Sequence, residues 1–435
     1  MRTAVSMSNS VSVVIAVFGI VVAPGPFGVL SGRLPRHLEN PVTQGDVLVS
    51  IRCGTVAPPP VPLKSADVRN LPPEPSGCEA LAGRPTDARN GDRPVKLDVQ
   101  LDGRPDEAAR RARTLIAAGV DGLFTFEGPH DVFLPLIVAA GSSDVPPADL
   151  MTNVAIAIPR SPMHLATMAY DLQLLSGGRF RLGLGSQIRP HIENRYGATW
   201  SRPAARMREA VLAVKAILNS WQDGTRLDFR GEFTRHTLMP ATFVPGPNPY
   251  GVPPVLLGAL GPVMTRTAAE VADGLLVMPF HSHTHFRERT LPAVAEGLKL
   301  AGRERIDLYP QAIVAMGDTP AEIEAATFGV KGLLAFYGST PAYRPVLDIE
   351  GWGDLQPELN ALSKAGDIMT MIGLIDDTMT RTLAVVGTPA ECAAEIKRRF
   401  GDVADRVCAY FPGSTHPPET IAALATELRG PAGSR

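Results

Sequence analysis

From Val95 onward, short runs of apolar and β-branched residues alternate with amphipathic stretches of helical period. Strands that alternate with helices in this way form βαβ units, in which neighbouring strands run parallel. The strand candidates number eight and lie at residues 97–101, 122–127, 151–157, 180–185, 254–259, 274–278, 308–316 and 406–411. Eight such repeats predict an α/β fold, a (β/α)8 TIM barrel with insertions. An open doubly wound sheet is the alternative, but its early glycine fingerprint at a strand-to-helix turn is missing.

The helices between the predicted strands carry recognisable start and stop residues. Pro105 fits the first turn of a helix that Gly119 closes. Ser161 can cap the helix after the third strand, and the pair Gly177 and Gly178 ends that helix. These signals support separate βα units between the strands.

Residues 1–94 differ in composition from the rest of the chain. Proline and glycine recur there without a period, as at residues 57–62 and 71–75, which disfavours helices and sheets and predicts disorder. An apolar run at residues 11–23 has the length of a signal-peptide core, so export is conceivable. The simpler hypothesis is an over-long gene model, with translation starting at Val95. We therefore expect a barrel domain at 95–435 behind a disordered or untranslated extension.

The composition excludes several classes of function. Lys and Arg total 42 against 44 Asp and Glu, so no basic excess indicates a nucleic-acid partner. Cys53, Cys78, Cys392 and Cys408 lack C-x-x-C spacing, which predicts neither a zinc site nor a disulfide framework. We expect a cytoplasmic protein with no membrane partner and a small-molecule substrate, with a homodimer left open.

In a TIM barrel the site is built from the loops at the carboxyl ends of the strands. The loop after the second strand holds Glu127 and His130, a carboxylate and an imidazole that could act as an acid–base pair; the alternative is a solvated loop. The loop after the fifth strand contains Gly261 just before a helix, where free backbone N–H groups could bind a phosphate; the alternative is a tight turn.

Three histidines follow the sixth strand at alternate positions, His281, His283 and His285. In an extended segment they would lie on one side, as in some metal sites. No carboxylate motif accompanies them, so we expect them to line the rim of a cavity and predict no metal site.

Several motifs together resemble the luciferase-like monooxygenase superfamily. The motifs have the order and spacing of that superfamily, and the similarity spans residues 95–428. They lie at residues 152–159, 164–166, 174–185, 207–209, 231–233, 254–258 and 271–274. Residues 127–134, 185–187 and 191–193 are similar to the branch that uses coenzyme F420, a deazaflavin.

The resemblance implies the same barrel and a set of site residues. The bond between Asn153 and Val154 corresponds to a cis peptide that packs against the deazaflavin ring. The other implied cofactor residues are Glu127 at the ring, Ser186, Gln187 and His191 along the polar side and tail, and Gly261, Val263 and Met264 at the phosphate.

The sequence departs from the family pattern at two positions. Several relatives have a proton-donating histidine directly after the acid, where this chain has Gly128, so His130 is the nearest imidazole. Relatives that oxidise sugar phosphates have a glutamate where Ile188 stands, so we do not expect a sugar-phosphate substrate.

The predicted function is hydride transfer between coenzyme F420 and a small organic substrate, with His130 or His191 supplying a proton. An FMN-dependent luciferase-like monooxygenase on the same barrel is the first alternative. A non-catalytic deazaflavin-binding protein is the second, and a metal-dependent hydrolase is the third.

Overall fold

The computed structural model describes residues 95–101, 104–404 and 406–430, so the predicted disorder of residues 1–94 lies outside the described residues. Parallel strands form a closed barrel, because β12 pairs with β1 and β9 pairs with β10. All eight predicted strands occur, with ends within two residues of the prediction. In chain order they are β1 (Lys96–Gln100), β2 (Gly122–Thr125), β3 (Asp149–Thr152) followed by the short β4 (Ala155–Ile156), β5 (Phe180–Gly185), β8 (Val255–Ala259), β9 (Gly274–Val277), β10 (Asp307–Met316) and β12 (Arg406–Tyr410).

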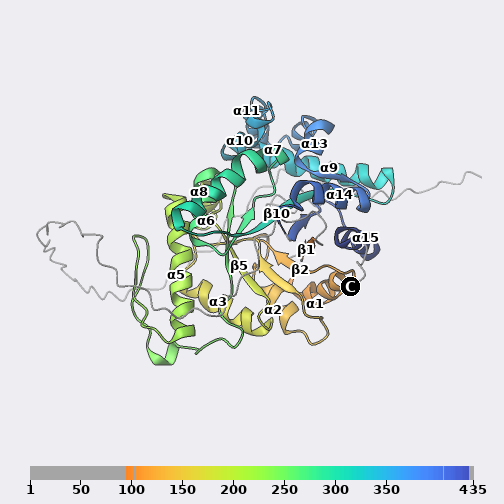
Figure 1. Cartoon of the computed structure of the whole chain (residues 1–435). Helices are drawn as coiled ribbons and strands as arrows, with labels where there is room; N and C mark the ends of the chain where they lie inside the picture. Colours follow the sequence, from red (N-terminus) through yellow and green to blue (C-terminus); the bar gives the residue numbers. More distant parts are fainter. Residues whose placement is uncertain (1–94, 102–103, 405, 431–435) are drawn as a thin grey trace, which may run out of the picture. The chain divides into compact units, whose positions relative to one another are not determined.

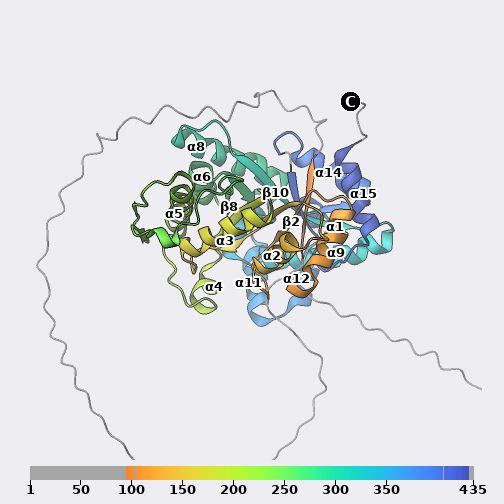
Figure 2. The same cartoon turned by 90° about the horizontal axis from the view of Figure 1, so that it is seen from below.

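Helices surround the strands on the outside (Figure 1 and Figure 2). The longer ones are α1 (Ala108–Ala117), α2 (Leu134–Gly141), α3 (Pro162–Leu175), α5 (Pro203–Asp223), α6 (Pro262–Val271), α8 (Leu291–Ala301), α14 (Pro389–Phe400) and α15 (Pro418–Arg429). The short ones are η1 (Pro105–Glu107), α4 (Arg189–Asn194), η2 (Ala241–Phe243), α7 (His283–His285) and η3 (Phe286–Thr290). The predicted signals are confirmed at α3, where the Ser161 side chain accepts from the Met163 N–H and Gly177 has a φ of +62°.

A large insertion follows β10 and forms a second apolar core. It comprises α9 (Pro320–Gly338), η4 (Pro341–Tyr343), α10 (Arg344–Ile349), α11 (Leu355–Ala365), α12 (Ile368–Gly373), α13 (Asp377–Leu383) and β11 (Val385–Gly387). Helices α10, α11 and α13 gather at one side of the barrel (Figure 1). Leu260 and Phe280, from the loops after β8 and β9, pack into this core. The insertion therefore buttresses loops at the carboxyl end of the barrel.

A small hairpin of β6 (Phe229–Arg230) and β7 (Arg235–His236) is tied to α5 by one carboxylate. Glu209 accepts hydrogen bonds from the backbone N–H groups of Glu232, Phe233 and Thr234. A Cβ on Gly231 would overlap this carboxylate, so the position requires glycine. These contacts give a structural role to two of the family motifs.

Ion pairs occupy the barrel near the amino ends of the strands. Arg406 pairs with Asp149 and lies 3.3 Å from Asp98, and Arg181 lies 3.2 Å from Asp149. Burial raises the pKa of Asp98 to about 7, against the opposing effect of Arg406. On the carboxyl side of this network, the interior of the barrel holds an apolar core that includes Phe124.

No helix within the described ranges has both the length and the apolar character needed to cross a membrane.

Candidate functional site

All barrel strands run parallel, so the loops after β2, β3, β5, β8 and β9 meet at one end of the barrel. The candidate site residues predicted from the sequence all follow these strands. Ser186 and Gln187 are hydrogen-bonded to each other, and the remaining predicted residues share this end of the barrel.

Glu127, after β2, is held by Arg160 from the loop after β4. Arg160 Nη1 lies 2.8 Å from Glu127 Oε2, and Arg160 Nη2 lies 2.8 Å from Oε1. The Ile156 N–H also donates to Oε2, at 3.2 Å. Glu127 is 9% exposed, so the pair is largely shielded from water. The carboxylate therefore joins the second and third strand loops, and its predicted acid–base role stays a prediction.

The peptide bond between Asn153 and Val154 is cis, as the resemblance implied. It separates β3 from β4, where the sequence predicted one continuous strand over 151–157. A Cβ on Gly185 would overlap Val154 Cγ2, and a Cβ on Gly258 would lie 3.2 Å from Cγ1. The Val154 side chain thus occupies space that two glycines of β5 and β8 leave open.

Asn153 has a fully bonded backbone and an unbonded side chain. Its N–H donates to the Thr125 carbonyl at 2.6 Å, and its carbonyl accepts from the Tyr410 hydroxyl at 3.2 Å. The side chain is buried, yet neither its oxygen nor its nitrogen has a hydrogen-bond partner among the described residues. Buried polar groups are normally hydrogen-bonded, so this carboxamide is a candidate ligand contact.

The loop after β5 turns sharply at Gln187, whose φ is +59°. Its side-chain oxygen accepts from the Ile188 N–H at 3.0 Å, and the Ser186 hydroxyl donates to the Gln187 carbonyl at 3.1 Å. Both polar side chains therefore stabilise their own loop. His191 follows in α4, where burial and, to a smaller extent, Arg195 lower its pKa.

Tyr196, just beyond α4, lies beside the Glu127 carboxylate. Burial raises its pKa, and the charge of Glu127 raises it further, while Arg195 and Arg160 oppose the shift. Within the described part of the chain its buried hydroxyl has no hydrogen-bond partner of good geometry. It is a second polar group at this end that a ligand could satisfy.

His130 is exposed on the loop after β2. Arg195 donates to the Gly128 carbonyl at 3.0 Å and links this loop to α4. His130 itself faces solvent at the rim of the barrel.

Helix α6 begins directly after Gly261, which is exposed. A Cβ at Gly261 would meet no atom within 4 Å, so the approach to this helix start is open. Val263, in the first turn, is 54% exposed. The N–H groups of Val263 and Met264 belong to the first turn, where they have no acceptor within the helix. The geometry therefore fits backbone binding of a phosphate.

The three histidines after β9 do not share one side of an extended segment. The segment forms α7 from His283 to His285, so it lacks the extended backbone that would place the three side chains on one side. His281 hydrogen-bonds the Met278 carbonyl at 2.7 Å, and burial lowers its pKa to about 3. Across the described ranges, no group of three His, Cys, Asp or Glu residues is arranged to hold a metal.

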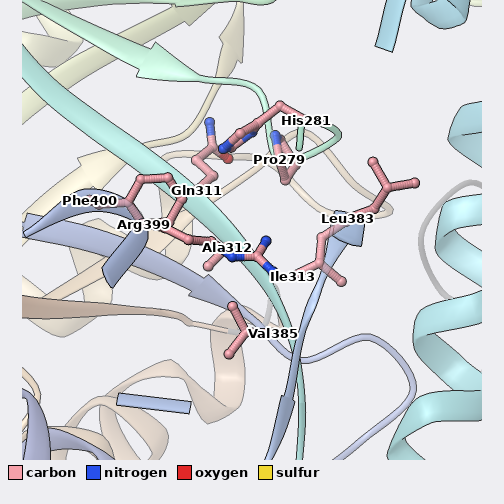
Figure 3. Close-up of a pocket in the computed structure, with 9 residues that line it drawn as sticks. All are labelled: Pro279, His281, Gln311, Ala312, Ile313, Leu383, Val385, Arg399 and Phe400. Carbon is pink, nitrogen blue, oxygen red and sulfur yellow. The ribbon is translucent and has the colours of Figure 1, made fainter. Parts of the chain in front are cut away.

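His281 also lines a narrow crevice between β10, α14 and the loop after β9 (Figure 3). The buried Arg399 guanidinium borders it and donates to the carbonyls of Arg381, Thr382 and Ala384 near the end of α13. The crevice holds no space for a water molecule. It is a packing feature, and His281 is part of the core there.

The luciferase-like monooxygenase family model matches residues 87–406, which is most of the chain. The chain belongs to the luciferase-like monooxygenase family. An uncharacterized protein of Mycobacterium tuberculosis is 45% identical over 78% of this chain and 99% of the relative. A 5,10-methylenetetrahydromethanopterin reductase of Methanolobus tindarius is 26% identical over 69% of this chain and 88% of the relative.

The solved structure of the coenzyme F420 dependent tetrahydromethanopterin reductase from Methanopyrus kandleri is similar in fold. Its TM-score is 0.64 at 21% identity, over 77% of this chain and 98% of that one. The likeness confirms the TIM barrel of this family member. Together with the family match and the reductase relative, it makes the chain a member of an oxidoreductase family.

The structure adds three site residues that the sequence did not reveal: Arg160, Tyr196 and Tyr410. Arg160 binds Glu127, Tyr196 lies beside the Glu127 carboxylate, and Tyr410 donates to the backbone carbonyl of Asn153. A flat ring with a phosphate tail fits this set, because the carboxamide of Asn153 is unbonded and the start of α6 is open.

Proposed function

We propose that this protein is a coenzyme F420-dependent oxidoreductase that moves a hydride between the deazaflavin and a small organic substrate. The observation that carries the proposal is the unbonded Asn153 carboxamide at the same end of the barrel as the open start of α6. A ring and a phosphate tail would satisfy both. The motifs shared with the deazaflavin-using branch and the relationship to a putative coenzyme F420-dependent oxidoreductase of Mycobacterium tuberculosis support this cofactor over FMN.

The chain's own residues would bind and orient the cofactor. The N–H groups of Val263 and Met264 would hold the phosphate, which Gly261 lets approach closely. Val154, whose side chain occupies the space left open by Gly185 and Gly258, would contact the ring. Ser186, Gln187 and His191 would border its polar side, as the resemblance implies. The cofactor supplies the two-electron hydride chemistry, and the protein supplies orientation and exclusion of water.

His191 and His130 are the proposed proton-transfer groups, and they differ in setting. His191 is partly buried and its lowered pKa leaves it neutral at pH 7, so it suits accepting a proton as a substrate is oxidised. His130 is exposed and would need the loop after β2 to move inward. These settings support His191 over His130 as the proton-transfer group.

An oxygen electrode separates the proposal from an FMN-dependent monooxygenase. The full chain is mixed with reduced FMN or reduced coenzyme F420, and protein-dependent O2 consumption is recorded. We expect neither mixture to consume O2 above the protein-free rate. Protein-dependent consumption with reduced FMN would contradict the proposal and support the monooxygenase.

A further inference from the structure

The backbone of Asn153 leaves only its side chain available to a ligand. The Thr125 carbonyl accepts from its N–H, and the Tyr410 hydroxyl donates to its carbonyl. The Tyr410 ring is itself fixed against Phe124, with centroids 4.8 Å apart. The backbone of Asn153 is therefore held by β2 and β12.

The chain on both sides of Asn153 packs into an apolar core. Asn153 directly follows β3, and Met151, two residues before it, belongs to the interior core with Phe124 and Leu256. Val154, on the other side of Asn153, packs against the same core. A leucine would fill such a place without leaving a donor and an acceptor unpaired. Packing alone does not explain an asparagine there.

We propose that the Asn153 carboxamide recognises the imide edge of the cofactor's ring. A carboxamide presents an N–H donor and a carbonyl acceptor side by side. The imide of a deazaflavin or flavin presents a carbonyl next to an N–H, which is the complementary pair. The inference rests on the proposed function only in requiring that such a ring binds beside Val154, and it holds for either cofactor.

The carboxamide can turn without a change in the backbone. Its terminal torsion is soft, so the amide can turn while the backbone bonds to Thr125 and Tyr410 persist. Tyr410 is then a positioning residue, because its hydroxyl binds the backbone carbonyl of Asn153, whose side chain recognises the ring.

The test compares the wild-type chain with Asn153→Leu, which is similar in size and cannot hydrogen-bond. The probes are tail-free deazaflavin and flavin chromophores, each with and without a methyl group on the imide nitrogen, titrated by fluorescence. We expect the wild type to bind an unmethylated ring about tenfold or more tightly than the methylated one. Asn153→Leu should bind the two forms equally and the unmethylated one more weakly than the wild type does.

Thermal unfolding of the ligand-free variant separates recognition from a structural role. Removal of an unpaired buried carboxamide should leave the melting temperature unchanged or higher. A lower melting temperature, or an unchanged preference between the two imides in the variant, would overturn the inference. If the wild type binds none of the four chromophores, the proposed function fails as well, so the two failures are distinguishable.

Discussion

The guanidinium of Arg160 holds both carboxylate oxygens of Glu127 at 2.8 Å, although the two residues are 33 apart in the chain. This ion pair links the loop after β2 to the loop after β4. Burial raises the energetic importance of the pair, since the Glu127 carboxylate left alone would have little water to solvate it.

Arg160→Met should therefore destabilise the protein by about 3 kcal/mol, because it leaves the Glu127 carboxylate buried and unpaired. The double variant with Glu127→Gln should lose less than the sum of the two single changes. Urea unfolding of the four proteins measures the coupling free energy. Strictly additive losses would show that the two side chains do not interact.

Gly185→Ala should cost about 1 to 3 kcal/mol, because the added methyl overlaps Val154 and the barrel must adjust. Cofactor affinity should fall as well, since Val154 is the proposed ring contact. Gly141→Ala is the matched control: it adds the same methyl at the end of α2, where no atom lies within 4 Å. Equal stability of the two variants would refute the close contact at Gly185.

Gly261→Val should fold like the wild type, because a Cβ there points into open space. Its affinity for coenzyme F420 should drop at least tenfold if a phosphate binds the adjacent N–H groups. Met264→Leu keeps the backbone and should change affinity little. The tail-free deazaflavin chromophore should bind both variants as it binds the wild type, and a loss for that chromophore would point to altered packing instead.

His281 should make the protein less stable in acid. Its pKa is about 3 when folded, because of burial, against about 6.5 when unfolded. As pH falls from 7.5 to 5, the unfolded chain takes up a proton that the folded chain refuses, so stability falls by about 2 kcal/mol from this group. Urea unfolding at both pH values should show a smaller loss for His281→Asn. The exposed His164→Gln is the control, and an identical loss in the His281 variant would exclude this source.

The fold was largely predictable because barrel strands buried on both faces appear as continuous apolar runs, as at residues 255–259 and 274–277. Two features were not. The third strand was predicted as continuous over 151–157, and no local pattern marks its break before Val154. Strand β11 has three residues, too few for a period to emerge, and it was missed.

The site was less predictable, because its key contacts join distant parts of the chain. Tyr410 bonds to Asn153 across 257 residues, and periodicity carries no such information. A weaker signal existed: Tyr410 shares a strand face with Cys408, so the strand pattern could have placed it in the barrel interior. Arg160 likewise follows the third strand, at the end where site residues were sought.

The most direct test of the account is a fluorescence titration of the full chain with coenzyme F420, FMN and NADPH under the same conditions. The proposed function predicts saturable binding of coenzyme F420 with a lower Kd than for FMN and no binding of NADPH. Tighter binding of FMN, or no binding of coenzyme F420 by folded protein, would contradict the assignment of this barrel as a deazaflavin-dependent oxidoreductase.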